Sequence, residues 1–99
     1  MFKVEILSSA DKALRKINLT ERVTIAQRIK KLSENSRPYG YRKLENSNFY
    51  RIRIGDYRVI YQINDKDLSI LIVRIGHRRE IYRRWIRLPY YKIPDLRIS

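Results

Sequence analysis

The sequence predicts a single small α+β domain in which a strand, two helices and three further strands follow one another, with a short helix after them. Two patterns predict this class. Apolar residues alternate with polar ones in four segments, as in strands with one buried face. Between the first two of these segments they recur at spacings of three and four, as in amphipathic helices. A length of 99 residues suits one core of this kind.

We expect this domain to cover residues 1–85. An extended tail is expected over residues 86–99, where Pro89 and Pro94 disfavour regular structure.

The first predicted strand covers residues 2–7, and its buried face comprises Phe2, Val4 and Ile6. The helix that follows begins near Ser8 and Ser9, whose hydroxyls suit the N-cap, and it ends near Ile17. Asp11 lies in its first turn, where a negative charge favours the helix dipole. The apolar side of this helix comprises Ala10, Leu14 and Ile17.

A second helix is predicted from Thr20 to about Glu34, after a break at Asn18. Its apolar stripe recurs at every third residue and comprises Val23, Ala26, Ile29 and Leu32. Because both helices are amphipathic, we expect the two to pack on one face of the sheet.

Three strands are predicted in the second half of the chain, after a loop over residues 35–43. They cover residues 49–54, 57–64 and 68–75. Only Gly55 and Asp56 separate the first two, and glycine in first place is typical of a type II′ hairpin turn. Residues 64–67 form the second turn, so antiparallel hairpins are expected, and a short helix is predicted around residues 79–85.

The two-residue turn fixes which residues face each other across the first hairpin. The predicted pairs are Ile54 with Tyr57, Arg53 with Arg58, and Ile52 with Val59. One face of the hairpins is apolar and should lie against the helices; it comprises Ile52, Ile54, Tyr57, Val59, Tyr61, Ile63, Leu68, Ile70 and Ile72. The opposite face carries Arg51, Arg53 and Arg58 together with Ile60, Leu71 and Val73.

The three arginines on the polar face form the first candidate site. Strand arginines commonly extend into solvent. Like charges directly across a strand pair destabilise a sheet, however, and these strands carry no acid on the same face. Guanidinium groups bind phosphate in a bidentate manner, so the cluster indicates an anion site. The apolar residues on this face would suit nucleic acid bases.

A second group of candidates lies after the third of these strands. Residues 76–82 contain His77, which is the only histidine, together with Arg78, Arg79 and Tyr82. Histidine exchanges protons near neutral pH, and a tyrosine hydroxyl surrounded by cations offers a second proton-transfer group. Each has a structural alternative: a surface histidine, and a core tyrosine on the final helix.

The chain has one histidine, no cysteine and scattered acids, so its sequence contains no cluster of metal ligands and no glycine-rich phosphate loop. The fixed cations, imidazole and phenols suit RNA cleavage without metal or cofactor. In that reaction the ribose 2′-OH attacks its own phosphate.

Composition supports a polyanionic partner. Twenty-three Lys and Arg against ten Asp and Glu give a net charge of +13, which favours nucleic acid first and an anionic membrane second. The lack of cysteine excludes disulfides and suits a reducing compartment, so we expect a cytoplasmic protein. No apolar run approaches the roughly 20 residues of a membrane span, and no membrane partner is expected.

Residues 50–61 have the sequence YRIRIGDYRVIY, and residues 73–82 have the sequence VRIGHRREIY. Together, at this spacing, the two segments resemble the RelE/ParE toxin superfamily and its RelE branch most. The resemblance covers residues 1 to about 85. It implies a ribosome-dependent endoribonuclease that cleaves mRNA and is neutralised by a cognate antitoxin. The tail from Ile86 departs from the compact ending expected of the family.

By this resemblance, Arg58 stabilises the charge of the transition state, and Arg78 engages the scissile phosphate and the leaving group. Tyr82 takes the proton of the 2′-OH, and His77 is a second candidate for acid or base work.

Arg51 and Arg53 occupy positions where the family often has lysine. Because arginine does not readily lose its proton, they are expected to stabilise charge rather than act as bases. Arg74 and Arg79 are expected to bind RNA phosphates as well.

The expected partners are the ribosome, with mRNA as substrate, and an antitoxin whose acidic segment covers the arginine face or adds a strand to a sheet edge. Two alternatives remain open at this point. One is the ParE branch of the superfamily, which shares the fold but inhibits DNA gyrase. The other is a basic RNA-binding or adaptor protein without catalysis, for which the net charge alone would suffice.

Overall fold

The structure, a computed structural model, describes residues 1–81 of the chain. The elements follow the predicted order, with one added strand before the hairpins. They are β1 (Lys3–Ile6), α1 (Ser8–Arg15), α2 (Leu19–Lys31), β2 (Arg42–Lys43), β3 (Phe49–Ile54), β4 (Tyr57–Asn64), β5 (Ser69–His77) and α3 (Arg78–Ile81). The predicted tail over residues 86–99 lies outside the described residues. Within residues 1–81, no helix is long and apolar enough to cross a membrane.

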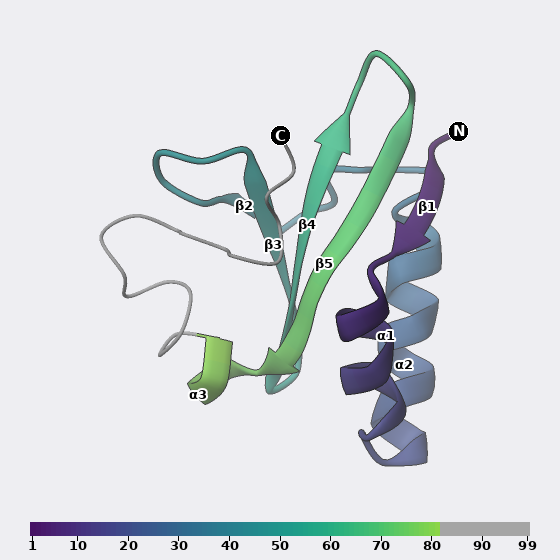
Figure 1. Ribbon diagram of the computed structural model, residues 1–99, viewed down its shortest axis with the longest axis vertical. Helices are drawn as coiled ribbons and strands as arrows, with labels where there is room; N and C mark the ends of the chain where they lie inside the picture. The colour runs from purple at the N-terminus through teal and green to yellow at the C-terminus, as the bar shows by residue number, and fades with distance from the viewer. Residues whose placement is uncertain (82–99) are drawn as a thin grey trace.

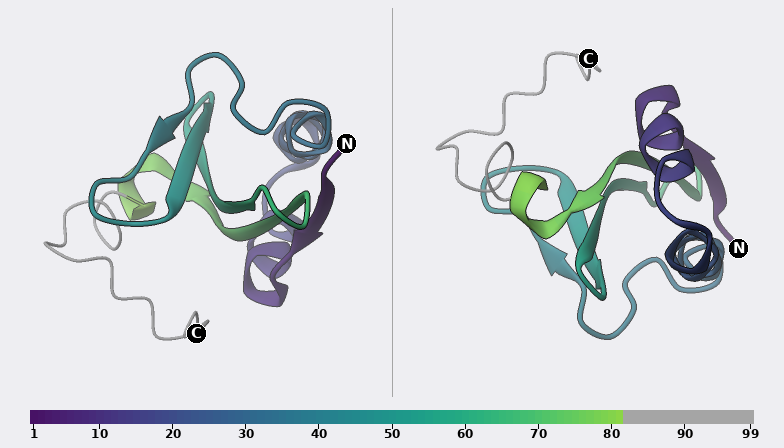
Figure 2. Two further views of the ribbon diagram at one scale, coloured as in Figure 1. Left: turned by 90° about the horizontal axis from the view of Figure 1, so that it is seen from above. Right: turned by 90° about the horizontal axis from the view of Figure 1, so that it is seen from below.

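All five strands form one sheet in the order β1-β5-β4-β3-β2. The predicted hairpins β3–β4 and β4–β5 are antiparallel, and β2 adds to the free side of β3 in the same sense. β1 runs parallel to β5, although β5 is the last strand along the chain. Helices α1 and α2 stand on one side of the sheet and α3 on the other (Figure 1). The end-on views show β4 between α2 and α3 (Figure 2).

The main core lies between the sheet and the two long helices, as predicted. Its buried residues are Ala10, Leu14, Ile25, Ile29, Leu32, Ile52, Ile54, Val59, Tyr61, Ile70, Ile72 and Ile75. Leu68 was expected on this face but is 48% exposed. The reason is that Leu68 belongs to the β4–β5 turn, where it has a left-handed backbone with φ of 52°, and β5 begins one residue later.

The predicted apolar stripe of α2 is wrong in part. Ile25, Ile29 and Leu32 are buried, whereas Val23 is 46% exposed and Ala26 is also exposed. Because a helix has 3.6 residues per turn, three residues make less than a full turn, and residues spaced by three rotate progressively away from the sheet. Residues spaced alternately by four and three stay on one side of the helix. The helix ends at Lys31, three residues before the predicted end.

The two helix starts differ in how they are capped. No serine caps α1: its N-cap residue is Leu7, without a side-chain hydrogen bond, so the predicted serine cap is wrong. α1 also ends at Arg15, before Ile17. The predicted break at Asn18 is confirmed and is the N-cap of α2, where the Asn18 side chain accepts a hydrogen bond from the Glu21 N–H at 3.1 Å. The Asn18 amide in turn donates to the Glu21 carboxylate at 2.8 Å.

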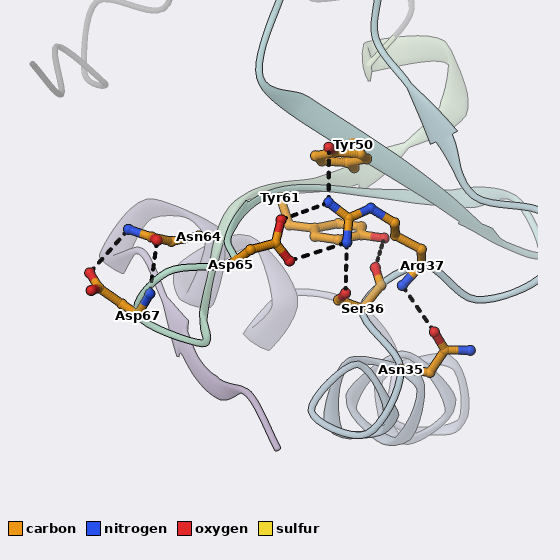
Figure 3. Close-up of polar contacts among 8 residues, drawn as sticks. All are labelled: Asn35, Ser36, Arg37, Tyr50, Tyr61, Asn64, Asp65 and Asp67. Carbon is orange, nitrogen blue, oxygen red and sulfur yellow. Dashed lines mark hydrogen bonds and ion pairs between the residues drawn. The ribbon is translucent and has the colours of Figure 1, made fainter.

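The loop between α2 and β2 is tied to the sheet through Arg37 (Figure 3). Its guanidinium donates to Asp65 in the β4–β5 turn at 3.0 Å and to the Tyr50 hydroxyl at 3.3 Å. The Tyr50 ring stacks on Tyr61 with a centroid separation of 5.9 Å. The buried Tyr61 hydroxyl donates to the Ser36 carbonyl at 2.8 Å. These contacts hold the loop against β3 and β4, and so they position β2 at the edge of the sheet.

Replacing Arg37 by Gln should raise the pKa of the Asp65 carboxyl group, because the hydrogen bond from Arg37 lowers that pKa in the folded chain. Because the pKa is lowered, the interaction stabilises the folded chain fully above the ordinary value of 3.8. This stability is lost as the pH falls from that value through the lower pKa of the folded chain. A carbon-13 titration of Asp65 should give a midpoint below 3.8 in the parent chain and near it in Arg37→Gln. Equal midpoints in the two proteins would contradict the contact.

Candidate active site

The register of the β3–β4 hairpin is the one predicted. Arg53 pairs with Arg58, Ile54 with Tyr57 and Ile52 with Val59. Gly55 has a φ of 60°, and Asp56 is not in the left-handed region, which fits the predicted type II′ turn. Because Ile52 and Val59 lie in the core under the helices, the arginines at 51, 53 and 58 belong to the opposite face of the sheet.

A β-bulge in β5 changes which residues reach this face. Ile60 pairs with Arg74 but Tyr61 pairs with Ile72, so Val73 is an extra residue opposite β4. Uninterrupted alternation from Ile70 and Ile72 would turn Arg74 towards the helices. The bulge instead places Arg74 on the arginine face and sends Ile75 into the main core. The bulge is visible in the sequence because the apolar positions of the core face change from even numbers, at 70 and 72, to an odd number, at 75.

The arginines of this face differ in exposure. Arg51 and Arg58 are each 4% exposed, Arg74 is half-buried and Arg53 is exposed. Extension into solvent therefore describes Arg53 alone. Arg58 is held by its Nη1 atom, which donates to the carbonyls of Gly55 and Tyr57, both at 3.0 Å. These bonds fix the guanidinium at the turn, and hydrogen bonding offsets part of the cost of burying its charge.

Helix α3 folds back over the same face. Ile81 is buried there with Leu44, Ile60 and Val73 in a second, smaller core. Gly76, which pairs with Arg58, lies beneath Ile81, and a Cβ at position 76 would be in ordinary contact with the Ile81 Cδ1 atom at 3.4 Å.

The start of α3 lies beside the β3–β4 turn. The Arg78 N–H donates to the Asp56 carbonyl at 2.8 Å, which brings the exposed Arg78 to the end of the sheet where Arg53 and Arg58 face each other. Arg79 follows Arg78 on α3 and is also exposed. The structure therefore places the predicted arginines of β3, β4 and β5 on one face of the sheet and Arg78 at the end of the sheet where the β3–β4 turn lies.

His77 lies elsewhere. It pairs with Tyr57 and contacts that ring edge-on with a centroid separation of 5.7 Å, on the helix side of the sheet. Its Nδ1 atom accepts a hydrogen bond from the Arg79 N–H at 3.2 Å, so in the neutral ring the proton resides on Nε2. The bulge that brings Arg74 to the arginine face thus takes His77 away from it. Tyr82 lies outside the described residues.

One basic residue of this face was not predicted. Arg42 on β2 pairs with Arg51, so it shares the arginine face at its outer edge. A strand of two residues carries no periodicity, and the basic pair at positions 42 and 43 is its only trace in the sequence. Within residues 1–81 no group of three or more His, Asp or Glu side chains is placed to hold a metal ion.

A groove of about 470 Å³ lies at the other end of the sheet. Its lining includes Glu5, Gln62, Asn64 and Asp65 and none of the candidate arginines. The arginine face is accordingly a charged surface between β2, β5 and α3 rather than part of this groove.

Comparisons with known proteins identify the family and the fold. The family model described as ParE toxin of type II toxin-antitoxin system, parDE, matches residues 4–82. A chain of the archaeal RelE–RelB complex from Pyrococcus horikoshii OT3 is 31% identical, with 78% of this chain and 94% of that chain covered and a TM-score of 0.71. The RelB–RelE complex from Methanococcus jannaschii contains a chain that is 26% identical, with 80% and 95% covered and a TM-score of 0.63.

Toxin RelG of Mycobacterium tuberculosis is 40% identical over 40 residues, which is 40% of this chain and 46% of that protein. The fold and the family match together define a toxin of a type II toxin–antitoxin system. The chain belongs to the RelE/ParE toxin superfamily and is RelE-like.

The packing of α3 on Gly76 can be tested by enlarging that residue. Gly76→Val should destabilise the fold by about 1–3 kcal/mol in urea unfolding, because its methyl groups press on Ile81 and the space under α3 is filled. Gly76→Ala is the matched control and should change stability by less than about 1 kcal/mol, since a single Cβ makes an ordinary contact. Equal stabilities for the two variants would show that α3 does not rest on this position.

Proposed function

We propose that this chain is a ribosome-dependent endoribonuclease that cleaves mRNA without a metal ion or cofactor. The observation that carries the proposal is the arginine face. Arg53 and Arg58 stand directly opposite each other, buried Arg51 and half-buried Arg74 share their face, and Arg78 lies at the same end of the sheet. Guanidinium groups gathered on one face in this way can bind a phosphate group in a bidentate manner.

In the proposed reaction the ribose 2′-oxygen attacks the adjacent phosphorus. The bond from phosphorus to the 2′-oxygen forms, and the bond to the 5′-oxygen of the next nucleotide breaks. The products are a 2′,3′-cyclic phosphate and a 5′-hydroxyl end. The leaving 5′-oxygen takes up a proton from a general acid or from water, which balances the proton that the 2′-OH loses to the base. Negative charge develops on the phosphoryl oxygens in the transition state. Arginines already fixed around the phosphate stabilise that charge without reorganisation.

The roles divide between the residues of this face. Arg58, whose guanidinium is fixed by the turn carbonyls, stabilises the charge on the phosphorane, and Arg51 and Arg53 support it. Arg78 engages the scissile phosphate and the leaving 5′-oxygen.

Arg74 and Arg79 bind phosphates of the same RNA. Because arginines keep their protons, the base that accepts the 2′-OH proton must be another group. We assign this role to Tyr82, with His77 as the second candidate.

The partners follow from the same surface and from the family. The basic residues of α1 and α2 contact ribosomal RNA, and the arginine face receives the mRNA in the decoding site. Several relatives were crystallised as complexes of RelE with RelB, and we propose an antitoxin partner for this chain as well. An antitoxin with an acidic segment would match the charge of the arginine face.

Inhibition of DNA gyrase is the second candidate function, because the matching family model is described as ParE toxin. The two functions leave different traces. A gyrase inhibitor produces trapped gyrase–DNA breaks and leaves mRNA intact. A basic RNA-binding or adaptor protein without catalysis produces neither mRNA cleavage nor growth arrest on expression.

Adding the chain to a translating extract should generate mRNA cuts at fixed positions within codons, mapped by sequencing the new 5′ ends. Arg58→Ala and Arg78→Ala should each lower the cleavage rate by about 10²–10³-fold, because each removes a charge aimed at the transition state. Lys3→Gln removes an exposed charge on the far edge strand β1 and should leave the rate unchanged. Normal cleavage by both arginine variants would refute the assigned site.

The identity of the base can be tested with two matched substitutions. Tyr82→Phe removes only a hydroxyl and should lower the cleavage rate by about 10²-fold or more. His77→Gln keeps a hydrogen-bonding side chain and should lower it less than about tenfold, because His77 lies on the helix side of the sheet. The reverse order of effects would assign the proton transfer to His77.

A further inference from the structure

We propose that Arg42 and Arg51 form a second phosphate subsite, which binds the RNA phosphate next to the scissile one. The inference rests on the proposed function and extends it. Its basis is the register of the outer strands. Arg42 on β2 pairs with Arg51 on β3 in the same way that Arg53 on β3 pairs with Arg58 on β4. The arginine face therefore carries two cross-strand arginine pairs rather than one.

The spacing of the two pairs suits a nucleic acid chain. Neighbouring strands lie about 4.8 Å apart, and residues two apart on one strand lie about 6.8 Å apart. The midpoint of the Arg42–Arg51 pair is displaced from that of the Arg53–Arg58 pair by one strand and one such step, which is about 8 Å. This distance is comparable with the separation of neighbouring phosphates in an extended single strand. The exposed side chains of Arg42 and Arg53 can adjust to the difference between the spacing of the pairs and the spacing of the phosphates.

Exposure distinguishes the two pairs and gives the RNA a direction. In the inner pair Arg58 is buried and fixed by the turn carbonyls, which suits the reacting phosphate. In the outer pair Arg51 is buried but Arg42 is exposed, on a strand of two residues at the edge of the sheet. The RNA backbone thus leaves the inner pair, crosses the outer pair and passes over the β2 edge.

The placement of β2 depends on contacts that the cleavage site does not use. The Arg37 guanidinium and the Tyr61 hydroxyl hold the preceding loop against β3 and β4, and the Leu44 N–H donates to the Phe49 carbonyl at 2.8 Å just after β2. Arg42 is thereby held in register with Arg51. Its role is binding rather than chemistry, because it lies beyond the inner pair.

The chain offers a matched control next to the residue in question. Lys43 is adjacent to Arg42, carries the same charge and is also exposed, but it pairs with Tyr50 and belongs to the helix side of the sheet. Arg42→Gln and Lys43→Gln therefore remove the same charge from opposite faces of one strand. A general effect of net charge weakens RNA binding equally in both variants, whereas a subsite responds to Arg42 alone.

The experiment measures binding of two short RNAs to the purified full chain at low salt. The probes are a trinucleotide with two phosphates and a dinucleotide with one, each with a 2′-deoxy sugar at the cleaved position. Arg42→Gln should weaken trinucleotide binding about tenfold and lower its salt slope by about one phosphate contact, with no change for the dinucleotide. Lys43→Gln should change the binding of the trinucleotide and of the dinucleotide by the same factor.

Thermal unfolding supplies an independent readout. Removing one of two like charges that face each other should raise the melting temperature of Arg42→Gln, and Lys43→Gln should not show this rise. Equal weakening of both probes by Arg42→Gln, or equal effects of the two variants on the trinucleotide, would overturn the subsite. If the parent chain cleaves mRNA but Arg42→Gln binds the trinucleotide normally, the subsite fails and the proposed function stands. If the subsite behaves as expected in a chain that cleaves no mRNA, the proposed function fails instead.

Discussion

The two-residue turn at Gly55 and Asp56 sets the register of the central hairpin, and the rest of the structure is arranged around that register. With Ile52 opposite Val59, one face of the hairpin is apolar and packs under α1 and α2. The same register places Arg53 opposite Arg58 on the other face. A shift of one residue would exchange the faces of one strand and bring arginine into the core. The hydrophobic effect thus enforces the arrangement of the charges, although it acts on the opposite side of the sheet.

Three local features shape the polar face on which we propose that phosphate binds. The bulge at Val73 brings Arg74 to the face, and the carbonyls of the turn hold the Arg58 guanidinium in place. Ile81 and α3 cover part of the surface beside Gly76. Each of these features concentrates positive charge in a partly dry environment, where electrostatic interactions are stronger than in water.

Sequence patterns predicted the parts of the fold that depend on local periodicity. The hairpin register follows from the turn length and the alternation of apolar residues. The predicted register is correct because Gly55 leaves few ways to close the turn. The parallel pairing of β1 with β5 and the two-residue β2 were not predicted, since they depend on contacts distant in sequence. The bulge was missed because regular alternation was assumed through β5, and it is the bulge that turns Arg74 to the arginine face and His77 to the helix side. Arg42 was missed because a strand of two residues carries no periodicity. The exposure of Val23 shows that a spacing of three does not by itself identify the buried side of a helix.

The central claim is that the arginines of one sheet face bind the RNA backbone together. Nuclear magnetic resonance of the arginine Nε–H groups tests it directly, during titration of the purified chain with the 2′-deoxy-substituted trinucleotide. The account predicts that the resonances of Arg51, Arg53, Arg58 and Arg74 shift together, while those of Arg15 and Arg37 stay in place. Shifts confined to the arginines of α1 and α2, with those of the sheet unchanged, would contradict it.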